Sequence, residues 1–74
     1  MENFENLANA IVLQAVKDYR KILKLCMEQP DYDKFRVSRE EIETFFRSDW
    51  FGILTELDGE WLIKKIKEEV GYEC

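Results

Sequence analysis

The chain has 74 residues and a formal net charge of −5, which gives it the length of one small domain and an acidic balance. Aromatic residues make up 14% of the sequence, a share that argues against intrinsic disorder. Histidine is absent, which removes the usual general base at neutral pH, the Ser/His and Cys/His catalytic pairs and the commonest metal ligand.

The first predicted element is a long helix from Phe4 to Met27, with Asn3 as its N-cap. Pro30 ends this helix, because proline cannot continue the backbone hydrogen bonds of a helix. Apolar residues recur along it at steps of three and four and form one face that we expect to be buried. These residues are Phe4, Ala8, Ile11, Val12, Ala15, Tyr19, Ile22, Leu23 and Cys26.

The segment from Asp31 to Val37 is predicted to be an ordered loop. The next helix is predicted to begin at Ser38, because Ser38 and Glu41 have the spacing of a capping box, in which each side chain bonds the backbone of the other. Within this helix Glu43 stands four residues before Arg47, so we expect an ion pair one turn apart.

Two further caps follow in the second half of the chain. Ser48 is a candidate N-cap for a short helix over Trp50 to Leu57, and the pattern leaves open whether this segment continues the preceding helix. The last helix is predicted to begin at Asp58 and to end at Gly71, in a left-handed conformation. Ion pairs four residues apart are expected on its outer face: Glu60–Lys64, Lys64–Glu68 and Lys65–Glu69.

Together these elements predict an all-α fold in one domain over residues 1–74. One long N-terminal helix packs against two or three shorter helices in a small helical bundle. Cys26 is interpreted as a core residue and Cys74 as a free thiol. No signal-peptide pattern opens the chain and no apolar run is long enough to cross a membrane, so we expect a cytoplasmic protein.

The run from Phe45 to Phe51 is rich in aromatic residues and is the most distinctive part of the sequence. Phe45 and Phe46 are expected in the core, packed on the Ala8–Ala15 region of the long helix. The rings of Trp50 and Phe51 are as well suited to a binding surface, because four rings on one helix cannot all face the same way. Tryptophan and arginine are favoured at binding hot spots. The candidate partner-binding residues are Arg47, Trp50, Phe51 and Trp61.

Two other surfaces of the long helix are candidates for association. Several apolar residues lie outside its main apolar face and suggest a homodimer through this helix; they are Leu7, Leu13, Leu25 and Met27. A basic stripe is an alternative site for nucleic acid, although a solvated face fits the acidic chain better; it contains Lys17, Arg20, Lys21 and Lys24. Asp31 and Asp33 lack the glycine and further ligands of a calcium loop, so no metal site is predicted.

Two stretches carry a family resemblance: Ala8-Asn9-Ala10-Ile11-Val12-Leu13-Gln14-Ala15-Val16-Lys17-Asp18-Tyr19-Arg20, and Phe45 to Phe51 followed by Leu54-Thr55-Glu56-Leu57-Asp58-Gly59-Glu60. The chain resembles small proteins of unknown function carried by phages, prophages and conjugative elements of Firmicutes. The likeness spans most of the chain and differs chiefly near Pro30. It implies a bacterial cytoplasm and a mobile element, and no activity or functional residue.

We therefore predict a non-enzymatic accessory protein that binds another protein, with inhibition or modulation of a host protein as one concrete version. No catalytic, cofactor-binding or metal-binding residue is predicted, and neither a cofactor nor a membrane is expected as a partner. The chain lacks a glycine-rich phosphate loop and a nucleophile–base pair. The alternative is a small nucleic-acid-associated regulator that uses the basic stripe of the long helix, against which the net charge acts.

Overall fold

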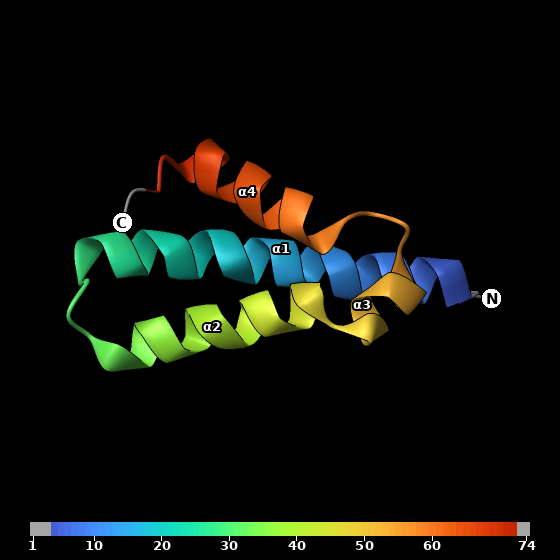
Figure 1. The fold of residues 1–74 in the computed structure, drawn as a ribbon, viewed down its shortest axis with the longest axis horizontal. Coiled ribbons are helices and arrows are strands. Elements are labelled where there is room, and N and C mark those ends of the chain that lie inside the picture. The colour runs from blue at the N-terminus through green and yellow to red at the C-terminus, as the bar shows by residue number, and fades with distance from the viewer. Residues whose placement is uncertain (1–3, 73–74) are drawn as a thin grey trace.

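The structure is a computed structural model that describes residues 4–72, with side chains from residue 7 to residue 72. It contains four helices and no strand within this range: α1 (Phe4–Glu28), α2 (Asp33–Arg47), α3 (Asp49–Leu54) and α4 (Gly59–Val70). In Figure 1, α1 runs along the long axis of the molecule with α2 on one side and α4 on the other, while α3 lies beside the N-terminal half of α1. The predicted all-α fold, with one long helix and shorter helices packed against it, is confirmed. The expected N-cap Asn3 and the expected free thiol of Cys74 lie outside the described residues.

The core lies where α1, α2 and α4 meet and extends under α3. The rings of Tyr19, Phe46 and Phe51 form its centre, with Tyr19 and Phe51 each packed edge-on against Phe46 at centroid distances of 5.5 and 5.4 Å. Burying a side chain of this size contributes roughly 1.5–3 kcal/mol. The other buried apolar residues are Ala8, Val12, Ile22, Leu23, Cys26, Leu54, Ile63 and Ile66. From Ala8 to Cys26 the predicted apolar face of the first helix is therefore the one that faces the core, and the side chain of Phe4 lies outside the described residues.

The second helix begins earlier than the sequence suggested. α2 begins at Asp33, so the prediction of a loop over Asp31 to Val37 and of a helix start at Ser38 is wrong. Neither proline nor glycine interrupts this stretch, and Asp33 places its charge at the positive end of the helix, where it also pairs with Arg36. Ser38 lies inside the helix, so it cannot adopt the extended backbone that a capping box requires.

A break at Ser48 separates α2 from α3. The backbone of Ser48 is extended, and its hydroxyl oxygen accepts a hydrogen bond from the amide of Phe51 at 3.3 Å. The hydroxyl also donates to the carbonyl of Phe45 at 2.6 Å, which ties the cap to the end of α2. α3 is therefore a separate helix, and it ends at Leu54, three residues before the predicted Leu57.

The predicted boundaries of α4 are confirmed. The Asp58 carboxylate accepts a hydrogen bond of 3.0 Å from the amide of Glu60, and Gly71 ends the helix with a φ of 70°. Gly59 stands so close to α2 that a Cβ atom there would lie 1.8 Å from the carbonyl oxygen of Phe46. Only glycine allows this approach, which places the first turn of α4 directly against the last turn of α2.

The ion pairs expected four residues apart along α4 are not among the pairs formed by the described residues, and two of its glutamates pair with other helices instead. Glu60 pairs with Arg47 of α2. Glu69 pairs with Arg20 of α1 and accepts a hydrogen bond of 3.1 Å from Arg20 Nη2 through Oε2. Within α4 the pair formed is Lys65–Glu68 at 3.8 Å, three residues apart instead of four. Exposed pairs of this kind are worth about 0–1 kcal/mol each, so their chief effect is on how the helices are oriented.

Among the described helices, only α1 has the length to span a bilayer at 25 residues, and its charged side chains make it too polar to do so.

Candidate protein-binding surface

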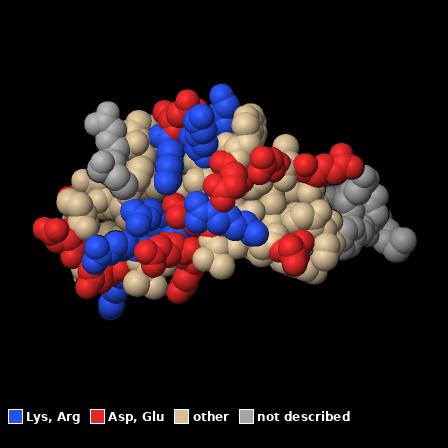
Figure 2. All heavy atoms as spheres, in the orientation of Figure 1, with Lys and Arg blue, Asp and Glu red and all other residues tan. Residues whose placement is uncertain are grey.

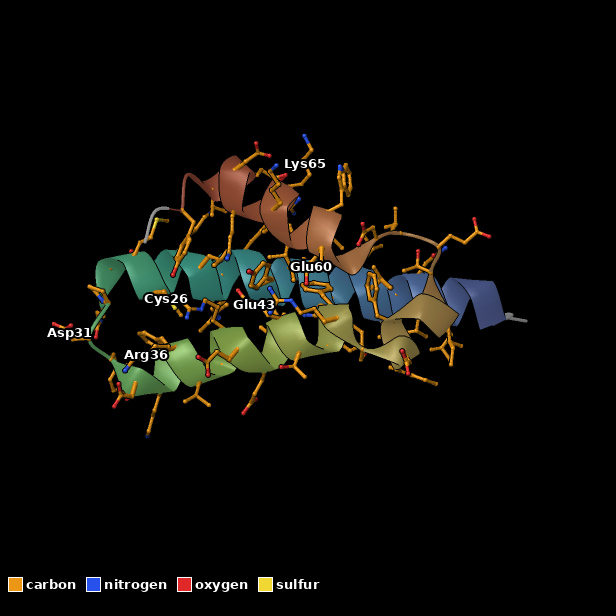
Figure 3. The ribbon with its side chains drawn as sticks, in the orientation of Figure 1. Cys26, Asp31, Arg36, Glu43, Glu60 and Lys65 are labelled. Atoms are coloured by element: carbon orange, nitrogen blue, oxygen red, sulfur yellow. The ribbon has the colours of Figure 1, made fainter. Side chains whose placement is uncertain are left out.

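A buried carboxylate joins the three long helices. Glu43 of α2 accepts a hydrogen bond of 2.6 Å from the hydroxyl of Tyr19 on α1. Three cations surround the same carboxylate: Lys67 of α4 at 3.6 Å, Arg47 at 3.8 Å and Arg39 at 4.0 Å. Figure 3 shows Glu43 between α1 and α2. We call these five residues the Glu43 junction.

The chemistry of the Glu43 junction favours a structural role. Burial raises the pKa of the Tyr19 hydroxyl above its ordinary value, and the hydrogen bond to Glu43 raises it further. Tyr19 therefore remains a proton donor at physiological pH. The Glu43 carboxylate accepts from Tyr19 and lies within 4.0 Å of three cations, so groups of its own chain balance its charge. A buried carboxylate paired in this way holds helices together.

The predicted Glu43–Arg47 pair is confirmed at 3.8 Å, and the structure buries its carboxylate. A signal for burial was present in the sequence. Glu43 has Arg39 four residues before it and Arg47 four residues after it, and it stands three residues before the core residue Phe46. A carboxylate flanked by cations at both four-residue steps is suited to burial, because its charge is balanced without water.

Metal-ligating side chains do not cluster among the described residues. These residues contain no group of three or more histidine, cysteine, aspartate or glutamate side chains that could hold a metal ion. Cys26 is buried in the core, where a thiol packs as a small apolar group. The candidate sites that the sequence predicted are binding surfaces.

The structure divides the predicted partner-binding residues. Trp50 is 51% exposed and Trp61 is 50% exposed, so both present about half of their surface to solvent. Phe51 is only 2% exposed, so its prediction as a binding residue is wrong. The reason is the cap at Ser48, because it starts α3 in an orientation that turns Phe51 inward and Trp50 outward.

Arg47 and Trp61 are each engaged by their own chain. Arg47 bonds Glu60 and lies near Glu43. The ammonium of Lys65 lies 5.8 Å from the centre of the Trp61 ring, within reach of a cation–π contact. Among the predicted partner-binding residues, Trp50 is thus the one that is exposed and makes neither an ion pair nor a cation–π contact in the described structure.

The four residues of the predicted dimer surface do not form one face. Leu7, Leu13 and Met27 are exposed, but Leu25 packs against the core. At about 100° per residue, Leu7 and Leu13 lie on opposite flanks of the buried face of α1. A single continuous dimer surface built from all four is therefore not present, and the homodimer itself stays a prediction.

The predicted basic stripe is also divided. Lys17, Lys21 and Lys24 are exposed on α1. Arg20 instead turns toward α4, where Glu69 neutralises it. Three lysines remain for contact with phosphates.

An apolar surface without cations covers α3 and the connection that follows it. Trp50 and Ile53 lie three residues apart on the outward side of α3, with Ile53 62% exposed, and Leu57 follows at 48%. Asp49 and Glu56 are the exposed carboxylates among them. We call these five residues the α3 surface. Ile53, Glu56 and Leu57 line a groove whose other wall is formed by Ala8 and Asn9 of α1.

All eleven lysine and arginine residues lie in 17–47 or 64–67, so none lies in the first 16 residues or between residues 48 and 63. Figure 2 shows the consequence on one face of the molecule, where basic side chains gather over one half and do not reach the end that carries α3. The α3 surface therefore combines apolar and acidic character.

Comparison of the chain with protein-family models, curated proteins and solved structures gave no match.

Proposed function

We propose that this chain is a non-enzymatic accessory protein that acts by binding another protein through the α3 surface. The observation that carries the proposal is the half-exposed ring of Trp50 beside the exposed Ile53. Tryptophan is among the residues most often found at binding hot spots, because its large ring buries much area at low entropic cost.

The small size of the domain strengthens this interpretation. A domain of this length buries only about 60% of the surface of its unfolded chain, so its stability depends on using its apolar residues well. Here three large apolar side chains, Trp50, Ile53 and Leu57, remain at the surface within eight residues. Leaving them outside forgoes stabilisation, which a partner that covers them would restore on binding.

The setting we propose is a bacterial cytoplasm and a phage or other mobile element, with a host protein as the target. The resemblance of the two quoted stretches supports this setting. A protein without a catalytic centre that acts on a host does so by occupying a surface of its target, and inhibition or modulation of that target is the effect we propose.

Nucleic-acid binding through the basic stripe is the weaker alternative. The net charge of −5 opposes approach to phosphates, and Arg20 is occupied by Glu69. A gel shift whose strength falls steeply with salt would favour this alternative over protein binding.

Affinity capture from the bacterial host tests the proposal, with wild type, Trp50→Ala and Met27→Ala as baits. Met27 is the matched control, because it is an exposed apolar residue near the opposite end of α1 from α3. We expect a partner that is retained by wild type and Met27→Ala and lost by Trp50→Ala, with the helical circular dichroism of all three unchanged. Identical capture by wild type and Trp50→Ala would contradict the proposal.

A further inference from the structure

We propose that the partner segment recognised by the α3 surface is a basic amphipathic helix, an inference that rests on the proposed function. Such a helix would place its apolar residues on Trp50, Ile53 and Leu57 and its lysine or arginine residues opposite Asp49 and Glu56. Three features of the α3 surface indicate this kind of partner. They are its charge, the two carboxylates that the chain leaves without an ion pair, and its shape.

The charge of the surface selects a cationic partner. Between residues 48 and 63 there are four carboxylates and no lysine or arginine. At this end of the molecule, nearby phosphates or anionic lipid headgroups would meet like charge, which opposes their binding. A segment that carries lysine or arginine would be attracted to it and oriented by it.

Two of these four carboxylates are already used by the chain. Glu60 pairs with Arg47, and Asp58 caps α4 by accepting from the amide of Glu60. Asp49 and Glu56 belong to none of the ion pairs that the described residues form. Both flank the exposed apolar residues of the α3 surface, so they are placed to receive cations from a bound segment.

The shape of the surface favours a helix over an extended peptide. The described structure has no strand, so an extended segment would find no sheet edge to join. Trp50 and Ile53 present a ridge, and the neighbouring groove between α3 and α1 is lined by the small Ala8 and by Gly52. An amphipathic helix, with apolar residues at three- and four-residue steps, can pack on such a ridge and groove.

A synthetic helical peptide is the direct probe. We would use a Leu/Lys amphipathic peptide of about five turns, and the same peptide with every lysine replaced by glutamate. The protein would carry Trp61→Phe, which leaves Trp50 as the single tryptophan reporter because the chain has two. We expect saturable binding of the lysine peptide with a blue shift of Trp50 emission, and no binding of the glutamate peptide.

Charge reversal on the α3 surface gives the matched comparison. Glu56→Lys should weaken binding of the lysine peptide at least tenfold. Asp31→Lys, the same change in the α1–α2 connection at the other end of the molecule (Figure 3), should weaken it less than threefold. Should Glu56→Lys fail to fold, Ile53→Ser is the second variant, with the same tenfold weakening expected.

Each contrary result has a distinct meaning. Absence of saturable binding, equal binding of the two peptides, or equal weakening by Glu56→Lys and Asp31→Lys would overturn the basic-helix inference. If host capture still depended on Trp50 in that case, the proposed function would stand with a partner of different chemistry. A dimer in light scattering that Trp50→Ala dissociates would also overturn the inference, because the α3 surface would then be covered by a second copy.

Discussion

The hydroxyl of Tyr19 on α1 donates a hydrogen bond of 2.6 Å to Oε2 of Glu43 on α2, in the interior of the domain. The two residues are 24 positions apart in the sequence, and neither reaches bulk water to a useful extent. Hydrogen bonds to charged groups are worth about 1.5–3 kcal/mol in folded proteins, so this single contact is a sizeable part of the stability of a small domain.

Tyr19→Phe removes the donor and keeps the ring. We expect the free energy of unfolding to fall by about 1.5–3 kcal/mol, because the Glu43 carboxylate loses a buried hydrogen bond. Urea unfolding followed by circular dichroism measures the change. Tyr32→Phe is the control, since Tyr32 is exposed and its loss of a hydroxyl should cost under about 0.5 kcal/mol. Equal losses for the two variants would argue against a structural role for the Tyr19 hydroxyl.

Alkaline pH should destabilise the protein through the same residue. The pKa of Tyr19 is raised in the folded state, so its contribution is fully present below the pKa of an unfolded tyrosine, about 10, and is lost as the pH rises above it. The unfolded chain releases this proton first, which gives a slope of up to about −1.4 kcal/mol per pH unit from this one group. Unfolding measured from pH 9 upward should therefore show a shallower alkaline loss for Tyr19→Phe than for Tyr32→Phe. Parallel curves would refute this assignment.

Glu43→Ala should be more damaging than Tyr19→Phe. Its removal takes away the carboxylate that Arg39, Arg47 and Lys67 share, while Arg47 keeps Glu60. Removing one partner of a buried ion pair typically costs about 3–5 kcal/mol, and the partial exposure of the three cations places the expected loss at the lower end of that range. The measurement is the midpoint of thermal unfolding, with Glu68→Ala as an exposed control on α4. A loss no greater than that of the control would show that the junction contributes little.

The glycines Gly52 and Gly59 should respond in opposite ways to alanine. Gly59→Ala forces a Cβ into the carbonyl oxygen of Phe46, and we expect a loss of more than about 3 kcal/mol or failure to fold. Gly52→Ala adds a methyl group to open space in the middle of α3 and should stabilise the protein by about 0.4–1 kcal/mol. Thermal unfolding of the two variants side by side checks both signs.

Trp50→Ala and Phe51→Ala should separate surface from core at adjacent positions. Phe51 packs edge-on against Phe45 and Phe46, so its truncation should cost about 3–5 kcal/mol. Trp50 is half exposed, and its truncation should cost about 1 kcal/mol. Urea unfolding gives both values. A similar loss for both would mean that the Trp50 ring supports the fold, which would weaken its assignment to a binding surface.

Local signals in the sequence predicted much of this fold. Ser48, Asp58 and Gly71 act through hydrogen bonds or backbone geometry within a few residues of themselves, so their effects are visible in a short window of sequence. The cap predicted at Ser38 failed because the same short signal competes with the continuity of a longer helix. The helix begins earlier because Asp33 places a negative charge in its first turn and pairs with Arg36. The residues around Ser38 do not indicate this earlier start.

The candidate site was harder to predict, because it depends on which way neighbouring rings turn. Trp50 and Phe51 differ in burial through the orientation that Ser48 gives to α3. The burial of Glu43 depends on Tyr19 and Lys67, which come from distant parts of the chain. The ion pairs of Glu60 and Glu69 likewise cross between helices, whereas sequence spacing suggested partners within α4.

The Glu43 junction has a consequence for how the domain comes apart. Because it takes Tyr19 from α1, Glu43 from α2 and Lys67 from α4, detaching any one helix breaks polar contacts of the other two. We therefore expect unfolding in a single cooperative transition, without stepwise fraying of α4. In hydrogen-exchange experiments, the slowest amides of these three helices should share one opening free energy, equal to that of global unfolding.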